Sequence, residues 1–206
     1  MDQAKILTAI EKKKVVLILL IITLIEGTWV LFTWWRNGIK FWNYMGFSSQ
    51  SSVWGWIACV IVILFYLVIG IRLPSVKQYL TNISWLKFLA LWMAFSSGIL
   101  EEVFFRKELM NFLKVHDYGS VLQVIFSGLI FGLIHGVWGL FGKNIRAAIG
   151  AAVATGILGF GLAFVFLASG RNLAPCIIAH FLINVLMEPG LVISAVKGEM
   201  TKKIKT

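Results

Sequence analysis

Long apolar runs, each close to the length that crosses a bilayer, constrain this chain more than any other feature of its sequence. A helix needs about 20 apolar residues to span the hydrocarbon core. Six runs approach that length: 15–35, 53–71, 85–110, 120–141, 147–168 and 173–196. We therefore predict an all-α, polytopic transmembrane helical bundle of about six spans, forming a single membrane domain over residues 1–206.

The composition supports a membrane protein rather than a soluble domain. Hydrophobic residues make up 59% of the 206 residues and charged residues only 14%, whereas soluble domains carry about 25% charged residues. The net charge of +10 does not indicate a nucleic-acid partner, because the cations stand at the ends of apolar runs. Examples are Lys12, Lys13 and Lys14 before the first run, and Lys197, Lys202, Lys203 and Lys205 after the last. Such cations face anionic lipid headgroups, so the expected partner is the lipid bilayer.

The distribution of positive charge predicts an orientation. The run 15–35 exceeds the roughly 7–15 residues of a signal-peptide core, so we interpret it as a retained first span. With six spans and a cytoplasmic N-terminus, thirteen of the 19 Lys and Arg residues fall inside and six outside. This excess favours the N-in orientation.

Small residues and a proline predict how the later spans pack. Gly128, Gly132 and Gly136 recur every four residues in the fourth run, and Ala148, Ala152 and Gly156 do the same in the fifth. Small residues at this spacing let helix backbones approach closely, so these two helices are predicted to pack tightly. The sequence Glu188-Pro189-Gly190 predicts a kink or a break in the last run.

The third run contains ionisable residues where an apolar span should have none. Glu102 and Arg106 are four residues apart, so they share a helix face and can form an ion pair. Glu101 lies one position round the helix and can point into a cavity, where a carboxylate can act as a general base. Burying such groups costs about 2.5–3.5 kcal/mol each on insertion scales, so they usually serve function. The alternative is an interfacial charge cluster, because Lys107 and Glu108 follow directly.

Two later runs carry histidines in apolar surroundings. His135 is a candidate catalytic group, or a structural histidine bonded to a backbone carbonyl. His180 and Asn184 project from one helix face, where they can bind a developing oxyanion or join two helices by hydrogen bonds. His116 lies beside Asp117 in a polar stretch and is interpreted as part of a loop.

The spacing of two of these residues predicts that they meet. Glu101 and His135 each lie seventeen positions from Tyr118, which stands in a predicted turn. If the two helices form an antiparallel hairpin about that turn, both residues lie about 25 Å from the bend. We therefore expect Glu101 and His135 to face each other at one depth.

The order of the motifs EExxxR, FxxxH and HxxxN on successive hydrophobic helices resembles the CPBP family of intramembrane proteases. This family includes CAAX prenyl endopeptidases and the bacteriocin-processing or self-immunity enzymes also called Abi proteins. The motifs comprise Glu101, Glu102 and Arg106, then Phe131 and His135, then His180 and Asn184. The resemblance covers a core of about residues 85–196, and the first two spans carry no part of it.

The resemblance implies an intramembrane endopeptidase. Glu101 would activate a water molecule with the help of His135. His180 and Asn184 would stabilise the tetrahedral oxyanion. Glu102 and Arg106, with Phe131, would support the site. A metal-free mechanism is favoured, with no cofactor. A catalytic zinc held by Glu101, His135 and His180 is the alternative, because two histidines and a carboxylate are also a zinc ligand set.

The family resemblance also gives expectations about the substrate, the membrane and the orientation of the chain. The partner would be a peptide or membrane-protein substrate, and the location a multi-pass position in a bacterial plasma membrane. In this family the EExxxR helix enters from the side opposite the cytosol, which is the reverse of the direction given by the charge count. Two other functions stay open: a non-catalytic immunity or scaffold protein of the same fold, and a proton-coupled transporter, for which the expected inverted repeat is not visible.

Overall fold

The computed structural model describes residues 7–137 and 145–197, and every regular element in these ranges is a helix. This confirms the predicted all-α class. Helix α1, Ala9–Asn37, is the longest single α-helix, with 29 residues. It begins at a capping box, in which the Thr8 side chain accepts from the Glu11 amide and the Glu11 carboxylate accepts from the Thr8 amide. Gly38, with φ 52°, then separates α1 from the short helix α2, Ile39–Tyr44.

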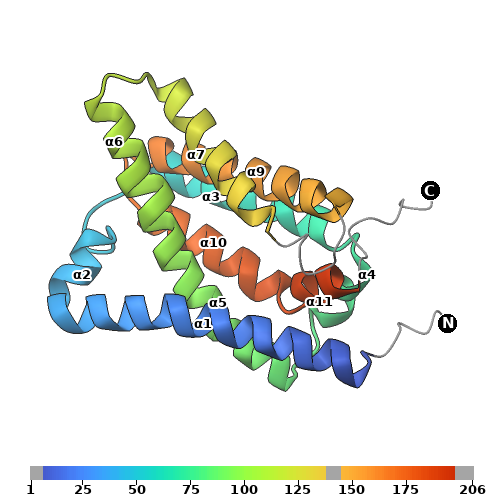
Figure 1. Ribbon diagram of the computed structural model, residues 1–206. Helices are drawn as coiled ribbons and strands as arrows, with labels where there is room; N and C mark the ends of the chain where they lie inside the picture. The colour runs from blue at the N-terminus through green and yellow to red at the C-terminus, as the bar shows by residue number, and fades with distance from the viewer. Residues whose placement is uncertain (1–6, 138–144, 198–206) are drawn as a thin grey trace.

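Helix α3, Val53–Gly70, begins where the Ser52 hydroxyl accepts from the Trp54 amide. The short helix α4, Pro74–Tyr79, begins with a proline, which suits the first turn of a helix. Helix α4 packs against the C-terminal helix α11, which in turn contacts α1. These contacts bring the two ends of the described chain to one end of the bundle (Figure 1).

The third predicted span is longer than expected and changes its winding. Helix α5, Trp85–Glu102, passes into a π-helical segment, η1, Val103–Leu109, and then into α6, Met110–Val115. The prediction ended this span at residue 110, whereas the helical path continues to Val115. A π segment inserts an extra residue per turn and often marks a functional site. Here it begins directly after Glu102.

Helices α7, Ser120–His135, and α9, Ile145–Ala168, form the closest pair in the bundle. A Cβ atom added at Gly132 would lie 2.4 Å from the Ala152 carbonyl oxygen and 2.8 Å from the Gly156 Cα atom. Backbone therefore meets backbone along the small-residue stripes, which confirms the tight packing predicted for these two helices.

The last predicted span is broken, as the proline predicted. Helix α10, Ala174–Met187, and helix α11, Gly190–Val196, meet at an angle of 59°. The Lys87 ammonium donates to the carbonyl oxygens of Leu186 and Glu188, which have no partner within α10 because the helix ends there. This contact joins the start of α5 to the bend between α10 and α11.

The prediction of about six spans is met in part. Four helical segments are long and apolar enough to cross a bilayer, and the bent pair α10 and α11 gives a fifth if it counts as one span. Helix α7 occupies the place of the predicted fourth span, but its 16 residues extend only about 24 Å. The predicted end of that span, 138–141, lies outside the described residues.

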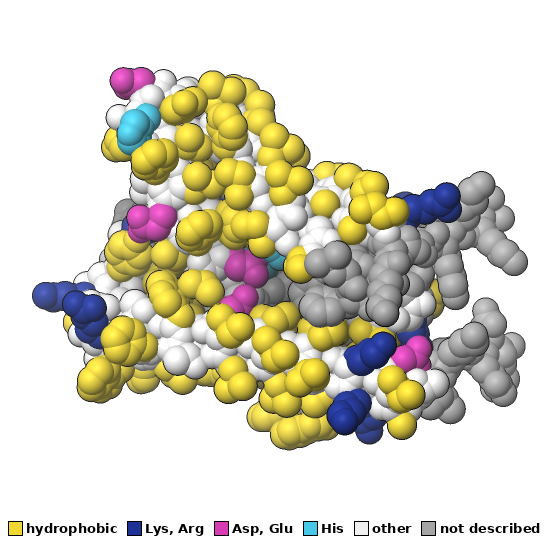
Figure 2. Space-filling view, viewed as in Figure 1, with side chains coloured by type: hydrophobic (Ala, Val, Ile, Leu, Met, Phe, Trp, Pro, Cys, Tyr) yellow, Lys and Arg dark blue, Asp and Glu magenta, His cyan; other side chains and the backbone are white. Residues whose placement is uncertain are grey.

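The basic residues gather mainly at one end of the bundle. Helices α1, α5 and α9 begin at this end and α3 ends there (Figure 1). Figure 2 shows dark blue side chains there, and a smaller group at the opposite end. The predicted grouping of cations includes Lys5, Lys143 and the lysines after 197, which lie outside the described residues. The described cations still segregate as membrane topology requires.

We predict that Gly132→Ala destabilises the protein by about 1–3 kcal/mol, because the added methyl group would overlap the Ala152 carbonyl and force α7 away from α9. The measurement is the thermal unfolding midpoint in detergent. Gly119→Ala is the matched control, because nothing lies within 4 Å of a Cβ atom at that position. Equal midpoints for the two variants would contradict the close backbone contact.

Candidate active site

A fully buried ion pair forms the base of the site. Glu102 and Arg106 are both 0% exposed, and Arg106 Nε lies 3.1 Å from Glu102 Oε2. Arg106 Nη2 also donates to the Gly159 carbonyl oxygen of α9, at 3.2 Å, and its guanidinium lies 4.6 Å from the centre of the Phe131 ring. The predicted pairing of Glu102 with Arg106 is present, and it connects the helical path of α5 and η1 to α7 and α9.

The π segment has a second contact with α7. The buried hydroxyl of Ser127 donates to the carbonyl oxygen of Phe105, at 3.1 Å. The rings of Phe105 and Phe131 meet edge to face, with 5.0 Å between their centres. These contacts hold the widened turn that carries Arg106 against the helix that carries His135.

The imidazole of His180 is oriented by the same carboxylate. His180 Nδ1 lies 2.7 Å from Glu102 Oε1, and the His180 side chain is 4% exposed. Because Glu102 pairs with Arg106 and so acts as a carboxylate acceptor, Nδ1 carries the proton of this bond. In neutral His180 the lone pair is then on Nε2. The side chain of Asn172 accepts from the Ala174 amide and so supports the start of α10, which presents His180 to this site.

The imidazole of His135 is oriented by the backbone. His135 Nδ1 lies 2.8 Å from the Phe131 carbonyl oxygen, which can only accept, so Nδ1 is again the donor. Phe131 is 1% exposed and lies 4.3 Å from the His135 ring and 5.9 Å from the His180 ring, between centres. It therefore fixes the separation of the two imidazoles, as well as covering Arg106.

Glu101 is the point at which the two imidazoles converge. Its Oε2 atom lies 3.6 Å from His135 Nε2 and 3.8 Å from His180 Nε2. The side chains of Glu101 and His135 are each 17% exposed, so the site is enclosed but reachable. This meeting is the one that the hairpin spacing predicts. Both distances exceed a hydrogen bond, and within the described residues Glu101 Oε2 has no hydrogen-bond partner.

Asn184 lies one turn further along α10, beside α5. Its Nδ2 atom donates to the Ser97 hydroxyl, at 3.0 Å, and Ser97 precedes Glu101 by four residues on the same helix. One N–H of the amide is used in this bond and the other is left for a ligand. All four predicted catalytic side chains therefore gather around the second half of α5.

The residues that the sequence reasoning missed lie on α1 and α5. Ser97 holds Asn184, and Glu26 is a further carboxyl group on α1, whose charge interacts with that of Glu101. The family resemblance does not extend to the first two spans, and Glu26 was not among the predicted site residues. The signal was present, because Glu26 is the only Asp or Glu within the apolar run 15–35.

The three residues suggested as zinc ligands, Glu101, His135 and His180, do meet. However, within residues 7–137 and 145–197 no three His, Cys, Asp or Glu side chains are arranged to hold a metal ion. Zinc requires each ligand atom at about 2.0–2.2 Å from the metal. As they are placed, these three side chains do not form a metal site in the part of the chain that the structure describes.

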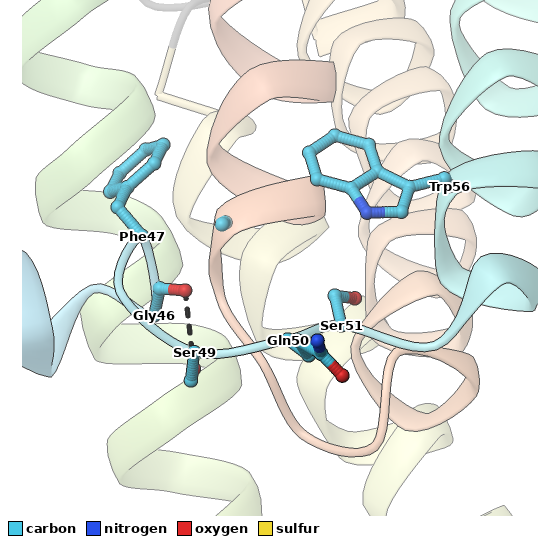
Figure 3. A pocket seen from close by; sticks show the side chains of 7 residues that line it. Gly46, Phe47, Ser49, Gln50, Ser51 and Trp56 are labelled. Atoms are coloured by element: carbon cyan, nitrogen blue, oxygen red, sulfur yellow. Dashed lines mark hydrogen bonds between the residues drawn. The ribbon is translucent and has the colours of Figure 1, made fainter.

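A separate pocket lies at the opposite end of α10, with a volume of about 360 Å³. It is bounded by the 46–51 loop together with Trp56 and Ala174 (Figure 3). None of its lining residues is acidic, and none is a histidine. It therefore lacks the groups needed for acid or base chemistry.

We predict that Arg106→Ala destabilises the protein by about 3–5 kcal/mol, because it leaves the Glu102 carboxylate buried without its cation. The matched control is Arg36→Ala, which removes an exposed arginine from the last turn of α1 and should change stability by about 0.5 kcal/mol or less. Chemical unfolding in detergent measures both. Equal losses of stability in the two variants would show that the buried ion pair contributes no more than an exposed arginine.

Comparison with known proteins supports the same interpretation. A family model for Rce1-like proteins, described as type II CAAX prenyl endopeptidase Rce1-like, matches residues 83–186. No curated protein and no solved structure matches the chain. The matched segment covers half of the chain and contains Glu101, Glu102, Arg106, Phe131, His135, His180 and Asn184. The chain belongs to the Rce1-like family of type II CAAX prenyl endopeptidases.

Proposed function

We propose that the protein is an intramembrane endopeptidase in which Glu101 and His135 activate a water molecule. The observation that carries the proposal is the convergence of His135 Nε2 and His180 Nε2 on one oxygen of Glu101, at 3.6 and 3.8 Å. The Nδ1 atom of His135 is bonded to the Phe131 carbonyl oxygen and that of His180 to the Glu102 carboxylate, so both Nε2 atoms are directed at Glu101. This set of groups can bind a water molecule and take its proton.

The hydrolysis can be written with the groups in place. Glu101 takes one proton of the water as the water oxygen bonds to the carbonyl carbon of the substrate, and His135 Nε2 accepts from the other O–H to hold the water. The carbonyl π electrons move to the oxygen. When the C–N bond breaks, Glu101 returns its proton to the leaving nitrogen. The enzyme thus regains its starting protonation state.

The oxyanion needs donors, and the geometry limits which groups supply them. Asn184 has one N–H free after its bond to Ser97. His180 can donate from Nε2 only as an imidazolium ion, since its Nδ1 proton is already directed at Glu102. The Glu102 carboxylate stabilises that ion. We propose that Glu102 acts through His180 in this way and is a positioning residue.

The substrate is proposed to be a peptide or membrane protein that enters from the lipid. An apolar groove lies beside the site, lined by Phe88, Leu91, Trp92, Phe95 and Phe181. Phe181 directly follows His180, and its ring meets that of Phe95 with 6.5 Å between centres. This groove suits the apolar part of a lipidated or membrane-embedded peptide, such as the prenyl group of the substrates named in the family's description.

We predict that Glu101→Gln lowers kcat/KM by about 10²–10⁴-fold, because the amide cannot accept the water proton. The substrate is a fluorogenic farnesylated CAAX peptide, with a transmembrane peptide as a second probe. Activity of the wild type should resist a chelator. Glu108→Gln is the matched control, since this exposed carboxylate lies on the same helical path and is bonded by Tyr44.

Two results would overturn this mechanism. Loss of wild-type activity on chelation would indicate a metal. Equal cleavage by the wild type and the Glu101→Gln variant would show that Glu101 is not the base. No cleavage of either probe by a folded wild type would favour the non-catalytic immunity or scaffold role, and proton flux into liposomes would favour the transporter.

We predict that Phe95→Ala raises KM for the farnesylated peptide by about tenfold, because a lost aromatic contact costs about 1.5 kcal/mol or more. The kcat and the KM for the unprenylated peptide should change little. Phe104→Ala is the matched control, since Phe104 is on the same helical path but its side chain is 54% exposed. An equal rise in KM for both peptides would exclude the groove as the lipid site.

A further inference from the structure

The helix outside the family-matched region presents a carboxyl group to the site. The buried residues of α1 form a stripe at helical spacing: Val15, Ile18, Leu19, Thr23, Gly27 and Val30. Glu26 lies on this stripe, three residues after Thr23 and four before Val30. The stripe faces α5, against which α1 makes its main contact. Glu26 therefore points to the helix that carries Glu101, and not to lipid.

The contacts of Glu26 place it beside the catalytic groups. Its carboxyl group lies near Ser96, a buried residue of α5 whose hydroxyl donates to the carbonyl oxygens of Trp92 and Met93, and it interacts electrostatically with Glu101. Gly27 brings the two helices together, because a Cβ atom there would lie 2.9 Å from Trp92 Nε1. Figure 2 shows acidic side chains beside a histidine in a hollow between α1 and α7.

Polar atoms without partners gather along this contact. Within the described residues, Thr23 Oγ1, Glu26 Oε2 and Glu101 Oε2 are all buried and have no hydrogen-bond partner. Buried polar atoms are nearly always bonded, to protein or to ordered water. Three such atoms therefore lie at the contact of α1 with α5, and their unused hydrogen-bonding capacity can bind water. Water is the reactant that the proposed hydrolysis consumes.

Other charged groups around α1 do not neutralise Glu26. On α5, Glu102 is paired with Arg106, and Lys87 donates to carbonyl oxygens at the α10 break. Helix α11 carries no titratable side chain. On α2, Lys40 is exposed and Tyr44 is bonded to Glu108. Glu26 thus faces a carboxyl group and no cation among the described residues of these helices.

We propose that Glu26 and Glu101 form a carboxyl pair that holds one proton, and that Glu26 keeps this proton while Glu101 acts as the base. Two carboxyl groups in one enclosed site cannot both ionise without strong repulsion. A protonated Glu26 keeps a single negative charge beside the substrate, so the oxyanion meets no second anion. Glu26 is a positioning residue: by staying protonated it leaves Glu101 as the ionised carboxylate. The proton of Glu26 is not transferred during the reaction.

The catalytic role of Glu26 rests on the proteolytic function proposed above, whereas the proton shared by Glu26 and Glu101 can be tested without that function. The test is therefore infrared spectroscopy of the full chain in phosphatidylglycerol and phosphatidylethanolamine vesicles. The wild type at neutral pH should show the carbonyl stretching band of a protonated carboxyl group, which the difference spectrum against Glu26→Gln isolates. Glu101→Gln should move the titration of this band to lower pH, because the opposing charge is gone.

Two variants keep the test decisive. Glu11→Gln removes a carboxylate from the first turn of the same helix, can retain its capping box, and should leave the band unchanged. Ser96→Ala keeps Glu26 but removes the hydroxyl group near its carboxyl group, so the band should persist at a shifted frequency. The proposal is overturned if wild-type and Glu26→Gln spectra coincide, or if Ser96→Ala and Glu101→Gln both leave the band unaltered.

Cleavage of the farnesylated CAAX peptide then tests the consequence. The wild type should lose kcat/KM at alkaline pH as the pair loses its proton, whereas the pH profile of Glu26→Gln should lack this alkaline loss. A purely structural role would change the level of activity without changing the pH profile. An unchanged profile in Glu26→Gln would overturn the catalytic role, even with the band present. Absence of all cleavage with the band present would count against the protease function alone.

Discussion

The buried pair of Glu102 and Arg106 is the interaction on which the rest of the structure depends. Both side chains are fully enclosed among apolar helices, where an uncompensated charge would be very costly. The pair is supported by two further hydrogen bonds, from Arg106 Nη2 to the Gly159 carbonyl oxygen and between Glu102 Oε1 and the His180 imidazole. Those same bonds connect α5 and η1 with α9 and α10, so satisfying one ion pair also assembles the site.

The neighbouring carboxylates Glu101 and Glu102 differ in role because their surroundings differ. Glu102 faces the interior, is fully paired, and orients His180. Glu101 faces a partly open space, with two imidazole nitrogens at distances too long for hydrogen bonds. Glu102 has one oxygen paired with Arg106 and the other bonded to His180, so its role is to support the site. Glu101 has unused bonding capacity, which is what binding and deprotonating a water molecule requires.

The N-terminal helix joins this arrangement although the family match begins after it. Glu26 stands on the buried stripe of α1 and faces α5, where its charge interacts with that of Glu101. In the proposed carboxyl pair, α1 sets the charge of the site as well as crossing the membrane.

Much of the fold and part of the site could be predicted from the sequence. Apolar length alone predicted the helical membrane bundle, because a bilayer permits few backbone structures. Four-residue spacings predicted the Glu102–Arg106 pair and the tight α7–α9 contact, and the hairpin spacing predicted the meeting of Glu101 with His135. These features depend on helical periodicity, which is local. The length of α7 within the described residues, the winding of η1 and the bond from His180 to Glu102 were not predictable in this way. They depend on which helices become neighbours, and only tertiary packing decides that. The same holds for Glu26: the sequence showed an isolated acid in a span, but the contact with α5 decided that it faces the site.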